Sequence, residues 1–169
     1  MLRFLLIFGV LMGVFYAVVL LPPDEHPTLG SFFTGYLNFY SQISGAVLDV
    51  LGHDITVYGQ SISSPEFQVR VVRGCDAMDA TALFVAAVIA SPVALRSKIS
   101  GVLGGILLLG LINLIRIVSL FYAGIHFSSK TFHTLHVEVW QPLFILLAVC
   151  FWLLWATWAK RRTASDVPT

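Results

Sequence analysis

The stretch Arg73-Gly74-Cys75-Asp76-Ala77-Met78-Asp79 marks the point where a polar, strand-like segment gives way to a long apolar run. The residues that follow, 80–93, carry no charge, and the run closes at Arg96-Ser97-Lys98. This pattern predicts a membrane-spanning helix over about residues 75–94. Cys75 is therefore expected at a membrane boundary with water on one side, where a thiol can react.

The composition of the 169-residue chain is that of an integral membrane protein. Hydrophobic residues make up 57% and charged residues 11%, whereas soluble domains average about 25% charged residues. Lys and Arg form no patch, so the formal net charge of +1 gives no indication of nucleic-acid binding. Cys150 lies deep in the last apolar run, where we expect a small buried residue and no disulfide with Cys75.

Apolar runs predict four membrane spans, at about residues 4–21, 75–94, 99–125 and 133–159. The first run lacks a small-x-small cleavage site before its closing prolines, so an uncleaved span is preferred to a signal peptide. Residues 1–162 then form a single multi-span membrane domain. Residues 163–169 are expected to be a disordered cytoplasmic tail.

The segment between the first two spans, residues 22–74, has two parts. Over residues 28–51, apolar side chains recur at steps of three and four, which predicts an amphipathic helix. The pattern leaves open whether this helix lies in the membrane interface or forms a further span. Apolar and polar residues then alternate around Ser63-Ser64-Pro65, which predicts a small β-hairpin leading into Cys75. The predicted fold is an all-α bundle of about four transmembrane helices, with this helix and hairpin on its outer face.

The distribution of basic residues predicts the orientation. The basic residues at the span ends share one side of a four-span topology: Arg3, Arg96, Lys98, Lys160, Arg161 and Arg162. The opposite loops hold only Arg70, Arg73 and Lys130. By the positive-inside rule, both termini are cytoplasmic and Cys75 faces the outer side.

Helix geometry predicts that three reactive side chains face one outer cavity if their helices are neighbours. Cys75 begins the second span and His136 begins the fourth, so they share a level. Arg116 lies about 14 Å below the outer end of the third span by helix rise, and its long side chain can extend upward. A cysteine nucleophile needs a base or a cation to lower its pKa. His136 would take the thiol proton, and Arg116 would hold the tetrahedral oxyanion.

Carboxylates near these residues have plainer interpretations. Arg116 also suits a structural ion pair with Asp76, Asp79 or Glu138. Asp76 and Asp79 suit either orientation of the histidine or capping of the second span, because carboxylates stabilise a helix N-terminus. Capping is the preferred role for at least one of them.

Two further polar residues are candidates for supporting roles. His133 is a rival to His136, because the two lie three residues apart at the start of one helix. Asn113 precedes Arg116 by three residues, so it suits either a hydrogen bond to Arg116 or a plain contact between helices. The sequence shows neither zinc-type ligand spacing nor a phosphate-binding glycine loop, so we expect no metal and no cofactor.

Three segments together resemble the exosortase/archaeosortase family, and most of all its exosortase H branch. They are Gly-Cys-Asp-Ala-Met-Asp-Ala (74–80), Asn-Leu-Ile-Arg-Ile-Val-Ser-Leu (113–120) and Phe-His-Thr-Leu-His-Val-Glu-Val-Trp-Gln (132–141). The resemblance implies that Cys75 is the nucleophile and that Arg116 and His136 are the family's arginine and histidine. One departure is that Asp76-Ala77 stand where the family often has a small polar residue and a glycine.

The resemblance implies a membrane-embedded cysteine protease or transpeptidase of the bacterial plasma membrane. Its substrates would be membrane-anchored exported proteins whose C-terminus carries a motif, a transmembrane helix and a basic tail. Cleavage would pass through a thioester on Cys75, and transfer would go to an unknown surface acceptor, with hydrolysis left open. The alternative is a non-enzymatic membrane assembly subunit with a structural network of Arg116 and carboxylates.

Overall fold

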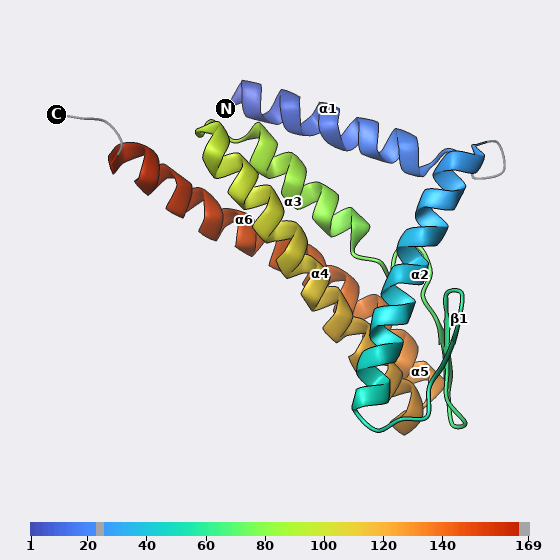
Figure 1. The fold of residues 1–169 in the computed structure, drawn as a ribbon. Coiled ribbons are helices and arrows are strands. Elements are labelled where there is room, and N and C mark those ends of the chain that lie inside the picture. Colours follow the sequence, from blue (N-terminus) through green and yellow to red (C-terminus); the bar gives the residue numbers. More distant parts are fainter. Residues whose placement is uncertain (23–25, 166–169) are drawn as a thin grey trace. The chain divides into compact units, whose positions relative to one another are not determined.

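The computed structural model describes residues 1–22 and 26–165, and most of them are helical (Figure 1). In chain order, the elements are α1 (Leu2–Val19), α2 (Pro27–Val50), β1 (Thr56–Tyr58), β2 (Ser61–Ser63), β3 (Gln68–Arg70), α3 (Met78–Ala90), α4 (Leu95–His126), α5 (Ser129–His133), the π-helix η1 (Thr134–Val139) and α6 (Trp140–Ser165). The chain divides into two compact units. We call residues 1–20, 78–109 and 143 onward the span unit, and residues 21–77 and 110–142 the site unit.

In the span unit, helices meet where aromatic rings lie against glycines. The Phe84 ring of α3 contacts Gly105 of α4 so closely that a Cβ at this position would clash with it. Trp155 of α6 packs in the same way on Gly101, and its Nε1 donates to Ser97 O at 3.2 Å. The glycines of the predicted third span therefore allow close helix contacts, as small residues do in membranes.

Three helical segments of the described residues are long and apolar enough to cross a membrane: Leu2–Val19, Leu95–His126 and Ser129–Arg162. The predicted all-α membrane fold is thus confirmed. Helix α3 has only 13 residues, so it is about 20 Å long, whereas a hydrocarbon core is about 30 Å thick. The count of four spans therefore stays a prediction. Because α3 begins at Met78, Cys75 lies in the loop before the helix, not in its first turn as the predicted span had it.

The C-terminal helix α6 continues to Ser165, into the range predicted as a disordered tail. Residues 166–169 of that range lie outside the described residues. Cys150 is exposed on α6, which corrects the expectation that it is buried, and both cysteines are free thiols.

The site unit contains a small antiparallel sheet in the order β1-β2-β3. Residues Ser61 and Ile62 of β2 pair with Arg70 and Val69 of β3, so a hairpin forms at the predicted turn but its first strand is β2. The sheet has one strand more than predicted, because β1 turns into β2 at Gly59, whose φ of 56° is left-handed. With only three residues, β2 is too short to show a period of two in the sequence.

The core of the site unit lies between α2, the sheet and the end of α4. Its buried side chains are Leu37, Tyr40, Leu48, Ile62, Val71, Ile117 and Phe121. Helix α2 confirms the predicted amphipathic helix. It is connected to the turn between β1 and β2 by a hydrogen bond, in which Ser41 Oγ donates to Gly59 O at 2.6 Å. Among the described residues, α2 does not belong to the helices that are long and apolar enough to cross a membrane. This core fixes the strand that leads to Cys75 against the end of α4.

Candidate active site

Cys75 lies in a tight loop that connects β3 to α3. Its backbone N–H donates to Val72 O at 2.9 Å, which closes a turn. Gly74 before it has a φ of 87°, and Ala77 after it has a φ of 57°. Both residues have left-handed backbone, and this backbone turns the chain around Cys75. A left-handed backbone is uncommon for a residue other than glycine, such as Ala77. The turn buries Cys75, whose exposure is 7%.

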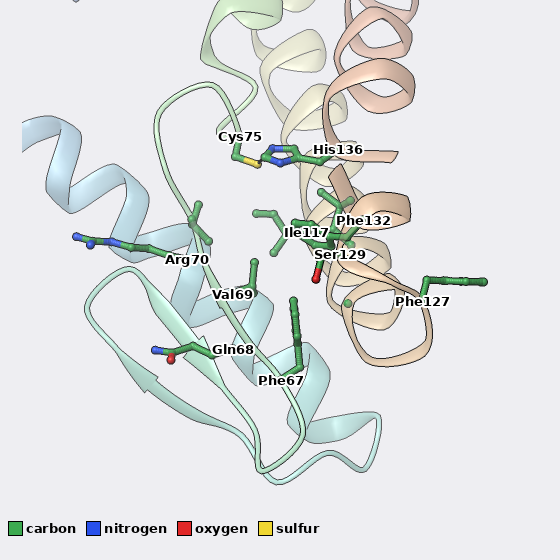
Figure 2. Close-up of a pocket in the computed structure, with 13 residues that line it drawn as sticks. Phe67, Gln68, Val69, Arg70, Cys75, Ile117, Phe127, Ser129, Phe132 and His136 are labelled. Carbon is green, nitrogen blue, oxygen red and sulfur yellow. Dashed lines mark hydrogen bonds between the residues drawn. The ribbon is translucent and has the colours of Figure 1, made fainter. Parts of the chain in front are cut away.

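The structure places His136 against this thiol (Figure 2). Cys75 Sγ and His136 Nε2 are 2.7 Å apart, although the residues are separated by 61 positions in the chain. The contact is within hydrogen-bonding distance, so the thiol can donate to Nε2 when the ring is in the tautomer that leaves this nitrogen unprotonated. It is the geometry that an imidazole base needs to take a thiol proton.

His136 belongs to the π-helix η1, a feature that the sequence analysis missed. The N–H of Trp140, which follows η1, donates to Leu135 O, five residues back, and so closes a wide turn. A signal for it exists in Pro142, which has no N–H to donate to the carbonyl of Glu138 and whose ring crowds that carbonyl. Single π turns are frequent at functional sites because they change the direction of the side chains they carry.

Arg116 lies within α4 and is 2% exposed. Its Nη2 is 3.5 Å from Gly74 O, at the limit of a hydrogen bond, so the guanidinium lies beside the backbone of the Cys75 loop. The three residues that the sequence analysis singled out are therefore brought together within the site unit.

Charges and burial act on the thiol in opposite directions. Burial raises the pKa of Cys75 most, the Arg116 guanidinium lowers it, and the Asp76 carboxylate raises it. The resting thiol is therefore protonated below its raised pKa, and a base must remove the proton when the thiol reacts. This requirement matches the position of His136.

The predicted supporting residues divide into two groups. Asp76 is buried, and its carbonyl accepts a hydrogen bond from Tyr36 Oη at 2.9 Å. Asp79, His133 and Glu138 are exposed side chains. Asp79 stands in the first turn of α3, where a carboxylate suits the helix dipole.

Two further polar residues of the site unit, Asn113 and Tyr36, have surroundings that the sequence did not indicate. Asn113 is fully buried, and its amide makes no hydrogen bond within the part of the chain that the structure describes. Tyr36 was missed by the sequence analysis as a site residue. It is a regular member of the apolar face of α2, and no local pattern indicates that its hydroxyl bonds the loop after Cys75.

A cavity of about 350 Å³ opens beside the thiol (Figure 2). Its lining is mostly apolar and includes Phe67, Val69, Ile117, Leu120 and Phe132, with Cys75 and His136 at one end. No group of three or more potential metal ligands occurs among the described residues. The cavity has the size and composition of a site for an organic group.

Comparison with known proteins identifies the family of the chain. A scan against protein-family models matched residues 4–140 to the transmembrane exosortase family. The match covers more than half of the chain and includes Cys75, Arg116 and His136. Searches of curated proteins and of solved structures gave no match. The family resemblance seen in the sequence is thereby confirmed.

Proposed function

Because this chain belongs to the transmembrane exosortase family, we propose that it is a cysteine transpeptidase that cleaves C-terminal sorting signals through Cys75. Family membership and the apolar helices make it a multi-pass membrane protein. At the level of the family they also support a membrane cysteine peptidase or transpeptidase. The proposed substrates are exported proteins that end in a short motif, a transmembrane helix and a basic tail.

The observation that carries the proposal is the 2.7 Å contact between Cys75 Sγ and His136 Nε2 beside the Arg116 side chain. In the proposed first step, His136 Nε2 takes the thiol proton and Sγ attacks the scissile carbonyl carbon. The carbonyl oxygen becomes an oxyanion. Arg116 faces the same loop, where a fixed cation in a poorly hydrated site stabilises such a charge strongly.

In the second step, the tetrahedral intermediate collapses and the carbon–nitrogen bond breaks. His136 gives its proton to the departing amine, which leaves with the transmembrane helix and basic tail. The remaining acyl group is held as a thioester on Cys75. An amine of a surface acceptor then attacks the thioester and restores the thiol, and water would give hydrolysis by the same route.

The proposed location is the bacterial plasma membrane, with both termini in the cytoplasm. The basic residues at the span ends support this orientation by the positive-inside rule. The active site then faces the outer side, where exported proteins and surface acceptors are found. Cys75 lies outside the helices that are long enough to span the membrane, which is consistent with a site at the membrane boundary.

The test is co-expression with a tagged candidate substrate that carries a motif, a transmembrane helix and a basic tail. Wild-type protein is expected to shift the substrate to a smaller size on a blot. Cys75→Ala, Arg116→Ala and His136→Ala proteins, at matched abundance, are expected to leave it uncut. Cys150→Ala is the matched control, because this second thiol lies on α6, outside the site unit.

The same experiment separates the enzyme from a structural assembly subunit. If cleavage persists in Cys75→Ala, the proposed nucleophile is wrong. The structural subunit replaces the enzyme if three results are found together. Wild type cleaves none of a panel of such substrates, deletion of the protein abolishes assembly of a surface structure, and the Cys75→Ala protein restores that assembly.

A further inference from the structure

We propose that the free edge of β3 binds the substrate as an added β-strand, so that an extended segment beside the scissile bond pairs with Gln68 and Arg70. This inference rests on the proposed function, and it specifies which conformation of the substrate the active site takes. Strand addition gives affinity through backbone hydrogen bonds and specificity through alternate side chains.

The hydrogen-bond pattern identifies the free edge. Val71 N–H donates to Gln60 O at 2.9 Å, and Ser64 N–H donates to Phe67 O at 2.8 Å. In an antiparallel pair, every second residue exchanges hydrogen bonds with the neighbouring strand. Phe67, Val69 and Val71 therefore turn their backbone groups toward β2.

The backbone groups of Gln68 and Arg70 consequently point the other way. Among the described residues, β3 has a neighbouring strand on one side only. Its outer side presents the N–H and C=O of these two residues, which form a template for another strand. A partner segment can thus exchange two pairs of hydrogen bonds with β3.

This edge borders the cavity that contains the thiol. Five consecutive residues, 67–71, line the cavity together with Cys75 and His136. Successive side chains of a strand point to opposite faces, so a cavity over one face would contact alternate residues. Contact with consecutive residues indicates that the cavity lies along the edge of the strand. Figure 2 shows the chain running from Phe67 past Val69 and Arg70 up to Cys75 along one side of this space.

The cavity wall opposite β3 favours an apolar side chain. Phe132 lies between Phe67 and His136. Its ring centre is 5.8 Å from that of Phe67 and 5.9 Å from that of His136. The far end of the Phe67 ring contacts Gly124 of α4, where a Cβ would overlap it. An extended segment on the edge of β3 would direct alternate side chains into this aromatic wall.

The distance along the chain limits where the docked segment lies. Arg70 and Cys75 are five residues apart, which is at most about 16 Å of extended chain. The turn closed by Cys75 N–H and Val72 O shortens this path. The paired segment therefore lies within about five residues of the scissile bond.

The test compares Arg70→Pro with Arg70→Ala. Both lose the side chain, but only Pro loses the N–H on the free edge, which β2 does not use. We expect Arg70→Pro to cleave the tagged substrate about two- to tenfold more slowly than Arg70→Ala. The rate of Cys75 alkylation by iodoacetamide should be equal in the two variants, because the thiol and its base are untouched.

A second measurement is independent of cleavage and of the stability of the proline variant. Gln68→Cys is made in a chain with Cys75→Ala and Cys150→Ala, and single cysteines are moved along the substrate segment next to the scissile bond. Disulfide cross-links are expected at every second position, which is the period of a paired strand.

The outcomes distinguish this inference from the proposed function. Strand addition is wrong, and the cysteine mechanism stands, if wild type cleaves the substrate but the two variants do not differ. In that case Arg70→Pro and Arg70→Ala have equal cleavage rates, and the cross-links show no period of two. Alternating cross-links without cleavage by wild type support docking and contradict the transpeptidase. Complete absence of cross-links overturns docking whether or not cleavage occurs.

Discussion

Replacing His136 by Ala should abolish most of the activity, and replacing His133 should not. His136 Nε2 lies 2.7 Å from Cys75 Sγ, so it is the group in position to take the thiol proton. Loss of a general base lowers a rate by about 10²–10⁴-fold. We expect a decrease of this size in the initial rate of substrate cleavage by His136→Ala.

His133 cannot replace the missing ring. It precedes His136 by three residues, which is about 4.5 Å of helix rise. Its side chain is exposed, and a general base must be within about 3.2 Å of the proton it removes. For His133→Ala we expect a rate within about twofold of wild type, as for an ordinary surface substitution.

The assay is a time course of substrate processing in membranes, with variants at matched abundance and over a range of pH. Without His136, the reaction depends on spontaneous ionisation of the thiol, whose pKa burial raises. Its rate should therefore increase with pH up to that raised pKa, and more steeply than in wild type. The reasoning is refuted if His133→Ala loses as much activity as His136→Ala, or if His136→Ala keeps wild-type rates.

Four further substitutions test the surroundings of the thiol. Asp76→Asn removes a charge that raises the pKa of Cys75, so iodoacetamide alkylation should shift to lower pH; a shift to higher pH contradicts this effect. Arg116→Gln removes a charge that lowers the same pKa, so its alkylation profile should shift to higher pH, and its cleavage rate should decrease about 10²–10³-fold. Ala77→Val puts a β-branched residue at a φ of 57°, where β-branched side chains are genuine outliers, so its melting temperature in detergent should decrease. Ala77→Gly removes the Cβ that strains this backbone, so it should melt no lower than wild type. Tyr36→Phe removes a hydrogen bond to the loop and should slow cleavage about two- to tenfold, and the exposed Tyr58→Phe serves as its control.

The approach of Cys75, His136 and Arg116 to one another could be predicted because a membrane restricts where such residues lie. Apolar runs and their charged ends fix the level of each residue, and Cys75 and His136 were placed at one level for that reason. Arg116 stands out because a charged side chain at membrane depth requires a partner or water. These arguments use only helix rise and burial of charge, which do not depend on fine details of packing.

The local geometry of the site depends on interactions that sequence patterns do not carry. A regular hydrophobic period gives no sign of the π turn at His136. Pro142, which cannot donate a helical N–H, is the one local signal near it. The hydrogen bond of Tyr36 joins positions 40 residues apart. The strand β2 was missed because three residues are too few for an alternating pattern.

Asp76 and Ala77, which depart from the residues that the family often has, affect the loop around Cys75 in two ways. Ala77 affects its backbone, and Asp76 affects the charge beside the thiol. Ala77 adopts the left-handed backbone that a glycine adopts more easily, and this costs about 1–2 kcal/mol. Its neighbour Asp76 contributes a backbone acceptor that Tyr36 holds in place. The carboxylate of Asp76 raises the pKa of the thiol, while Arg116 on the other side lowers it. The loop holds Cys75 beside His136, and in the proposed mechanism activation of the thiol falls to His136 and Arg116.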